Sequence, residues 1–274
     1  MKDEEPKPRT TEHKLGSWEE FVERVAFFDS EARKPWDEVW YRGQSCADWR
    51  LQTTLERRCS EAHSVASYLT AACEILPAVE TFTGNQFPFR SQQDLIMLCT
   101  EQPRFDERFR SWATYLAHLR HGGFPSPLLD WTASPYVAAY FAFQNARDER
   151  NVSIYAYQEW AGGIKVAGPS EPHIFSLGPN FKTHKRHFRQ QSRYTACVQF
   201  DLKKGNWLFQ PHDSVFLLRD HLKQDLLWKF TIPASERLKV LRFCQQVNLN
   251  AFTLFESEEG LLETEAMRVF DLRA

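Results

Sequence analysis

The sequence predicts an α+β fold in one domain, with a helical N-terminal part and a mixed or antiparallel sheet as its core. Helical periodicity dominates the first half of the chain, and short β-type runs dominate after about residue 150. The 274 residues are 42% apolar and 14% aromatic, which is enough to build one large core.

The N-terminal region begins with residues 1–15, which carry many charges and no apolar periodicity. We expect them to be a flexible arm. The capping-box pattern Ser17-Trp18-Glu19-Glu20 predicts the start of a helix. Residues 38–41 then resemble a strand that delivers Arg42 to its end.

Three helical regions follow in the sequence pattern. Apolar residues recur at three- and four-residue spacings over residues 60–76 and 91–119, with an interruption at Pro103. A third helix is expected over residues 134–148, because Ser134 can cap it and Pro135 suits its first position.

The second half of the chain alternates short apolar runs with glycine and proline. We expect strands at 152–157, 194–200, 214–218, 227–232 and 251–255. A helix should begin at Pro233, and Gly260 should open the C-terminal tail.

The most informative stretch runs from a glycine- and proline-rich loop into the helix expected at Ser134. Asp130, Thr132 and Ser134 lie at this junction. Backbone N–H groups at a helix start suit a phosphate-bearing ligand, so the junction is a candidate ligand site. The alternative is that these side chains only close a strand-to-helix turn.

Four blocks of the sequence, in the same order, resemble the FRG domain family. They are Tyr41-Arg42-Gly43-Gln44, the stretch from His121 through Asp130 and Thr132, the stretch from Arg186 through Gln190 and Gln191 to Thr195, and residues 232–260. The resemblance covers roughly residues 17–265, so we expect residues 16–274 to form one FRG-like domain. Pro127 stands where relatives carry an arginine.

A second resemblance, to mono-ADP-ribosyltransferases, rests on three short motifs in order. An arginine (Arg42), a Thr/Ser pair (Thr132, Ser134) and a late glutamate make up the pattern. The resemblance implies an ADP-ribosyltransferase-like fold and NAD as the donor substrate. It implies that Arg42 holds the pyrophosphate or a ribose, and that the glutamate stabilises positive charge on the sugar.

These resemblances divide the candidate residues into two groups. The expected catalytic residues are Glu256, Glu259 and Ser134. The expected NAD-binding residues are Tyr41, Arg42, Gly43, Gln44, His121, Asp130 and Thr132. Which of Glu256, Glu258 and Glu259 is the catalytic acid stays open. The alternative interpretations are that these glutamates belong to a solvated helix start, and that Arg42 forms a buried ion pair with Asp130 or Asp48.

The leading hypothesis is an NAD-dependent ADP-ribosyltransferase that modifies a macromolecule. The basic, aromatic-rich segment 181–194 makes RNA or DNA a candidate acceptor, and a solvated charged face is its alternative reading. Resemblance alone implies a toxin-like role in bacterial anti-phage defence, with a neutralising antitoxin partner. The competing hypotheses are an NAD glycohydrolase and a non-catalytic nucleotide- or nucleic-acid-binding module.

Composition and cysteine spacing exclude several other classes. The net charge of −2 gives no overall basic field of the kind that nucleic-acid-binding proteins show. The six cysteines are scattered without a Cys-x-x-Cys pair, so we expect no metal. No signal peptide or long apolar run is visible, and we expect a cytoplasmic protein without membrane contact.

Overall fold

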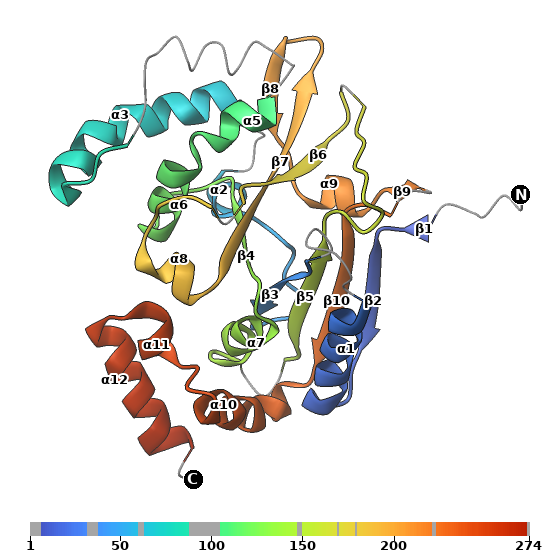
Figure 1. Ribbon diagram of the computed structural model, residues 1–274, viewed down its shortest axis with the longest axis vertical. Coiled ribbons are helices and arrows are strands. Elements are labelled where there is room, and N and C mark those ends of the chain that lie inside the picture. Colours follow the sequence, from blue (N-terminus) through green and yellow to red (C-terminus); the bar gives the residue numbers. More distant parts are fainter. Residues whose placement is uncertain are drawn as a thin grey trace, which may run out of the picture.

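The computed structural model describes residues 7–31, 38–59, 63–87, 105–146, 150–168, 170–178, 180–220 and 223–272. Within them the chain forms one mixed sheet with helices packed around it, as expected for the α+β class (Figure 1). The eight strands of this sheet are β2 (Thr10–Lys14), β3 (Trp40–Gln44), β4 (Leu129–Thr132), β5 (Val152–Gln158), β6 (His173–Ser176), β7 (Ser192–Asp201), β8 (Asn206–Phe209) and β10 (Leu226–Ile232). A separate two-stranded pair joins β1 (Lys7–Pro8) to β9 (Arg219–Asp220).

The strand order is β2-β10-β5-β3-β4-β7-β6, with β8 paired to β7. Only the β10–β2 pair is parallel among these strands. Strand β3 pairs with β5 along its whole length, from Trp40 to Gln44. It pairs with β4 at a single position, Tyr41 opposite Thr132, so the ladder between β3 and β4 extends no further.

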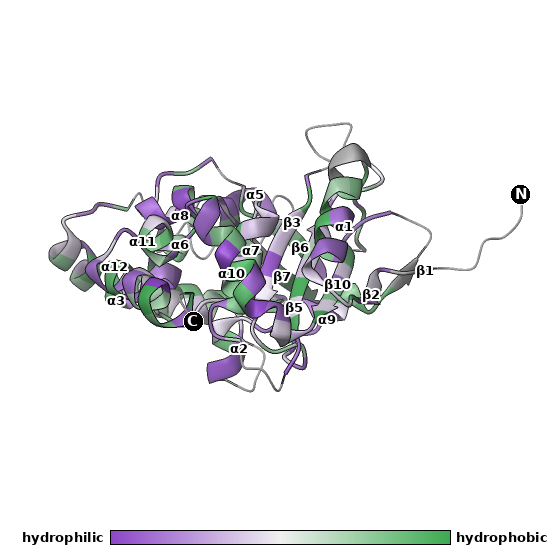
Figure 2. Cartoon of the chain, turned by 90° about the horizontal axis from the view of Figure 1, so that it is seen from below, coloured by the Kyte–Doolittle hydropathy of each residue, from purple (hydrophilic) through white to green (hydrophobic). Residues whose placement is uncertain are grey.

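Helices from the early, middle and late parts of the chain surround the sheet. They are α1 (Trp18–Glu31), α2 (Thr54–Arg58), α3 (Val65–Thr83), α5 (Phe105–Arg110), α6 (Ala113–His121), α7 (Pro135–Phe143), α8 (Lys185–Arg189), α9 (Asp213–Phe216), α10 (Arg237–Gln246), α11 (Ala251–Phe255) and α12 (Glu258–Ala266), with short 3-10 and π turns at Ala234–Glu236 and Met267–Asp271. One apolar cluster joins α1, α7 and α10 to strands β3, β5 and β10. Another joins α3, α5 and α6 to β6, β7 and β8. Figure 2 shows apolar residues on the central strands and on parts of the helices around them.

Helix α7 lies directly against the middle of strand β3. Ser134 caps its N-terminus by accepting a hydrogen bond from the Val137 N–H, as the sequence predicts. A Cβ atom on Gly43 would lie 1.9 Å from the carbonyl oxygen of Ala138. Glycine at position 43 therefore permits the close approach of helix to strand.

The C-terminal elements differ from the prediction. Residues 251–255 form helix α11 and not a strand, because Asn250 and Thr253 make a reciprocal capping box at its start. Gly260 lies inside α12 and does not open a tail. A Cβ atom there would meet the Ala251 carbonyl oxygen at 2.9 Å, so this glycine lets α12 pack closely on α11.

Other boundaries also differ from the prediction. Residues 213–216 are helix α9 and not part of a strand. Residues 10–14 of the expected flexible arm form β2, since their backbone pairs with β10 far along the chain. Strand β3 extends to Gln44, so Arg42 lies in its middle and not at its end.

The three expected helical regions are present in part. Helix α3 runs from Val65, just after the Ser64 cap, to Thr83, so it begins five residues later and ends seven residues later than the predicted range of 60–76. The region expected over residues 91–119 falls partly outside the described residues, and its described part contains α5 and α6. In the described part of the chain, no helix is long and apolar enough to cross a membrane.

Candidate functional site

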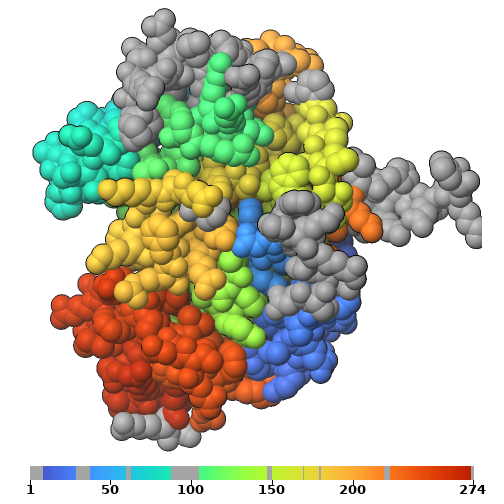
Figure 3. Space-filling view, viewed as in Figure 1, coloured from blue at the N-terminus to red at the C-terminus, as the bar shows by residue number. Residues whose placement is uncertain are grey.

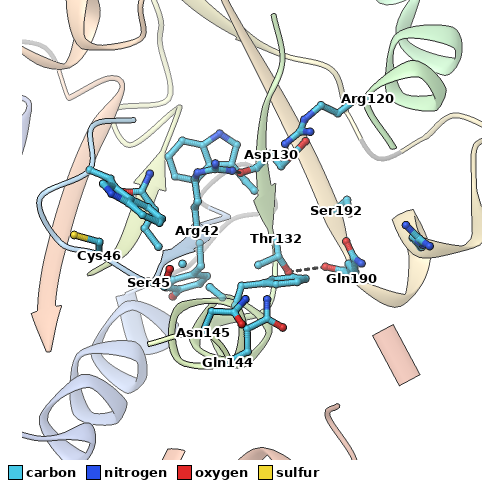
Figure 4. Close-up of a pocket in the computed structure, with 18 of the residues that line it drawn as sticks. Arg42, Ser45, Cys46, Arg120, Asp130, Thr132, Gln144, Asn145, Gln190 and Ser192 are labelled. Carbon is cyan, nitrogen blue, oxygen red and sulfur yellow. Dashed lines mark hydrogen bonds and ion pairs between the residues drawn. The ribbon is translucent and has the colours of Figure 1, made fainter. Parts of the chain in front are cut away.

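A cavity of about 870 Å³ opens beside the point where strands β3 and β4 stop pairing (Figure 4). This volume lies within the range of small-molecule and cofactor sites. The cavity is lined by Tyr41, Arg42, Gly43, Gln44, Ser45, Cys46, Trp49, Arg57, Arg120, His121, Asp130, Trp131, Thr132, Ala138, Phe141, Gln144, Asn145, Arg150, Arg186, Gln190, Ser192 and Phe255. The lining residues thus come from both halves of the chain, including β3, β4, α7, α8 and α11.

Within the part of the chain that the structure describes, five arginines line this cavity, against a single carboxylate, that of Asp130. Arg120 donates from Nη2 to Asp130 Oδ2, at 2.5 Å. Arg42 donates from Nη1 to the backbone carbonyl oxygen of Asp130, at 2.7 Å. Arg42 therefore makes no direct ion pair with the Asp130 carboxylate, although the charge of Asp130 partly offsets the lowering of the Arg42 pKa by burial.

Several buried polar atoms of the cavity lining have no hydrogen-bond partner within the described chain. They are the Nε atoms of Arg42, Arg120 and Arg186, Oε1 of Gln44 and Oδ1 of Asp130. Buried polar groups in native proteins are nearly always paired with protein, solvent or ligand. Their concentration here is typical of a site built for a polar partner.

One wall of the cavity is aromatic. The rings of Phe141 and Phe255 meet edge to face at 6.1 Å, and the guanidinium of Arg186 lies 5.2 Å from the centre of the Phe255 ring. Gln144 and Asn145, just after α7, bring amide groups to the cavity (Figure 4). An aromatic wall beside amide groups suits a planar ring with hydrogen-bonding edges.

His121 lines the cavity as a neutral imidazole at neutral pH. Burial lowers its pKa to about 4, and Arg120 and two other histidines act in the same direction. Its Nε2 atom lies 2.8 Å from the hydroxyl of Tyr194, which also contacts His187 Nδ1 at 3.1 Å. These contacts fix the ring, so His121 presents a neutral polar group at a constant position.

Thr132 and Ser134 hold the turn into α7 together. The Thr132 hydroxyl donates to the Gln190 carbonyl oxygen at 2.7 Å and accepts from the Ser134 N–H at 3.0 Å. Thr132 lines the cavity, whereas Ser134 does not, and its hydroxyl caps the helix. Both hydroxyls thus have the turn-closing contacts that the sequence left as an alternative.

The two candidate glutamates lie outside the cavity lining. Glu256 ends α11 in the left-handed conformation, with φ of 50°. Its carboxylate accepts two hydrogen bonds from Arg189, at 2.8 and 3.2 Å, and these lower its pKa. Glu259 is exposed in the first turn of α12, where hydrogen bonds with its own backbone and with the Ser257 side chain lower its pKa.

The structure therefore separates the two groups of expected residues. All seven expected NAD-binding residues line one cavity, namely Tyr41, Arg42, Gly43, Gln44, His121, Asp130 and Thr132. None of the three expected catalytic residues, Ser134, Glu256 and Glu259, lines it. Sequence reasoning overlooked Arg120 and Arg150, which bear no local motif and reach the cavity only through the packing of the chain.

Several basic side chains of the segment 181–194 form ion pairs with acidic residues of the same chain. Arg189 pairs with Glu256, and Arg193 pairs with Glu38 at 2.7 Å. Lys185 lies 3.7 Å from Glu256. Figure 3 shows this gold-coloured region adjoining the red C-terminal helices. The segment thus fastens α8 to α11 and contributes Arg186 to the cavity.

Comparison with known families connects this site to one domain type. Residues 37–151 match the family model of the FRG domain, and this range contains β3, β4, α7 and four of the five cavity arginines. Comparisons with curated proteins and with solved structures found no match. Within the described residues, no group of three or more His, Cys, Asp or Glu side chains is arranged to hold a metal ion.

Proposed function

We propose that the cavity binds NAD and that the protein transfers the ADP-ribosyl group of NAD to a macromolecule. The observation that carries this proposal is the excess of arginine: of the described side chains that line the cavity, five carry a guanidinium group and one carries a carboxylate. Arginine binds phosphate oxygens through charge-assisted, often bidentate hydrogen bonds. A ligand with a pyrophosphate would offset this excess positive charge.

Two parts of the cavity lining suit the two kinds of group in a dinucleotide. Arg42 and Arg120 lie around Asp130, and their Nε atoms lack protein partners, so they suit the pyrophosphate. Phe141 and Phe255 suit a planar base or the nicotinamide ring. NAD carries both groups in one molecule.

A non-catalytic nucleotide-binding module is the second candidate. It is favoured by the positions of Glu256 and Glu259, which lie outside the cavity lining. An NAD glycohydrolase would use the same cavity with water as the acceptor. An RNA or DNA acceptor, a cytoplasmic role in anti-phage defence and an antitoxin partner rest on resemblance alone and form part of the proposal.

The direct test incubates the purified protein with NAD labelled in the adenylate part, together with cellular protein, RNA and DNA. Label in one macromolecular fraction supports the transferase and identifies the acceptor class. Free ADP-ribose without labelled macromolecule indicates a glycohydrolase. Saturable binding with intact NAD indicates the binding module, and the absence of both binding and turnover refutes the proposal.

A matched pair of variants ties the result to the cavity. Arg120→Gln removes a cavity guanidinium, whereas Arg268→Gln removes one that pairs with Glu265 outside the lining. We expect only the first to weaken NAD binding. Equal effects of the two changes would contradict binding in this cavity.

A further inference from the structure

We propose that Asp130 is the carboxylate that stabilises the sugar cation when the bond to nicotinamide breaks. This inference rests on the proposed function and assigns its chemistry to a residue that we expected only to bind NAD. Breaking an N-glycosidic bond develops positive charge on the ribose, and a fixed negative charge nearby lowers the energy of that transition state.

Position is the first reason. Among the described residues that line the cavity, Asp130 carries the only carboxylate. Its side chain is 32% exposed, so a ligand in the cavity can reach it. Glu256 and Glu259 are absent from the lining, and so they do not meet this requirement.

Rigidity is the second reason. Asp130 lies within β4, where it is paired opposite Tyr194 of β7. Its carbonyl oxygen accepts the hydrogen bond from Arg42, and its Oδ2 atom accepts the one from Arg120. Both the backbone and the carboxylate are therefore held in place before a ligand binds, which favours electrostatic stabilisation.

Once NAD is bound, the surrounding arginines do not cancel the effect of the Asp130 charge on the sugar. The two negative charges of the pyrophosphate would offset the guanidinium groups that face it. The Asp130 carboxylate is then left to act on the positive charge that appears at the sugar. Figure 4 shows Asp130 between Arg42 and Arg120, on the side of the cavity away from Gln144 and Asn145.

The chemical step involves only NAD as the donor and the macromolecule as the acceptor, and it needs no further reactant. The bond between ribose C1′ and the nicotinamide nitrogen breaks, and its electron pair leaves with nicotinamide. A lone pair of the acceptor then forms the new bond at C1′, and the acceptor proton passes to solvent. The Asp130 carboxylate neither gains nor loses a proton in this step, and it accepts a hydrogen bond from a ribose hydroxyl.

The charge of Glu256, by contrast, is already paired with basic side chains outside the cavity lining. Its carboxylate lies against Arg189 at 2.8 Å and Lys185 at 3.7 Å. This ion pair is exposed and fastens α8 to α11. Glu256 thus serves as a control acid that lies outside the cavity lining.

The test compares Asp130→Asn with Glu256→Gln, using nicotinamide release as the assay for turnover and calorimetry for NAD affinity. Asparagine keeps the size of the side chain and can still accept a hydrogen bond from Arg120, but it carries no charge. We expect turnover to fall by about 100-fold or more in Asp130→Asn, with NAD affinity changed by less than about tenfold. Glu256→Gln should keep its turnover within about twofold of the unchanged protein.

Each outcome separates this inference from the proposed function. If the unchanged protein releases nicotinamide and Asp130→Asn does so equally fast, the role of Asp130 is refuted and the proposed function stands. If the unchanged protein releases none, the proposed function fails, and this inference fails with it. Should Asp130→Asn not fold, Asp130→Glu is the second variant, which keeps the charge but places it one methylene further out. Normal turnover in Asp130→Glu refutes the claim that the position of this carboxylate matters. A folded Asp130→Glu protein whose turnover is reduced about tenfold or more supports that claim.

Discussion

Replacing Gly43 by alanine tests how tightly helix α7 is seated on the strand that carries Arg42. The added Cβ would lie 1.9 Å from the Ala138 carbonyl oxygen and 2.7 Å from the Ala142 nitrogen. Ordinary contacts begin at about 3.4 Å, so α7 would have to withdraw by roughly 1.5 Å. The atoms in the way belong to the main chain and cannot rotate aside.

The expected loss is at the upper end of what overpacking costs, about 3 kcal/mol. For a domain of this size, that corresponds to a fall in melting temperature of about 6–12 °C. The alanines of α7 that face β3 are fully buried, so a helix that withdraws would also open the main apolar cluster. Thermal unfolding followed by circular dichroism measures the effect.

Gly122→Ala is the matched control for this change. Gly122 has an ordinary helical φ of −76°, and a Cβ there would lie 3.5 Å from the nearest atoms. We expect its free energy of unfolding to change by no more than about 0.5 kcal/mol. Equal melting temperatures for the two variants would refute the packing argument at Gly43.

Three further predictions concern single side chains. Arg42→Ala should weaken NAD binding about 10- to 100-fold in calorimetry with little change in melting temperature, because charge-assisted hydrogen bonds to the ligand are lost; a large fall in melting temperature with unchanged affinity would show that Arg42 is structural instead. Arg189→Gln should move the pKa of Glu256 up toward its ordinary value, since the Arg189 hydrogen bonds are the main cause of its lowering; an unchanged carboxyl titration in NMR spectra would contradict this. Burial lowers the pKa of His212 to about 3, below its ordinary 6.5, so the unfolded chain binds the proton more readily and stability falls as the pH drops below about 6.5. Between pH 7 and pH 5 this amounts to roughly 2 kcal/mol in urea unfolding, and a His212→Gln variant with the same pH dependence would refute the assignment.

The sequence predicts an element correctly where a signal within a few residues determines its structure. The start of α7 follows from Ser134 and Pro135, because a cap and a first-turn proline act within one helical turn. The central strands β5 and β10 follow from their apolar runs. By contrast, β2 could not be predicted, since Thr10–Lys14 becomes a strand only by pairing with β10 more than two hundred residues later.

The candidate site, too, could be predicted only in part. The NAD-binding candidates came from motifs at β3 and β4, and the fold brings these strands together at the cavity. The strand expected just before the glutamates is a helix, because a run of five residues, 251–255, fits a strand or a helix equally well by apolar pattern. The Asn250 and Thr253 capping pair was a local signal for the helix, and it was overlooked.

The strand order also determines which pieces of this chain could exist alone. The segment that matches the FRG family model, residues 37–151, contains β3 and β4. The pairing partners of these strands lie outside it: β4 pairs with β7, and β3 pairs with β5, which starts at Val152. Cut out of the chain, that segment would expose unpaired strand edges, and such edges promote association between molecules. Fragments for expression or domain grafting should therefore keep β5, β7 and β10 attached, because the matched segment is shorter than the sheet to which its strands belong.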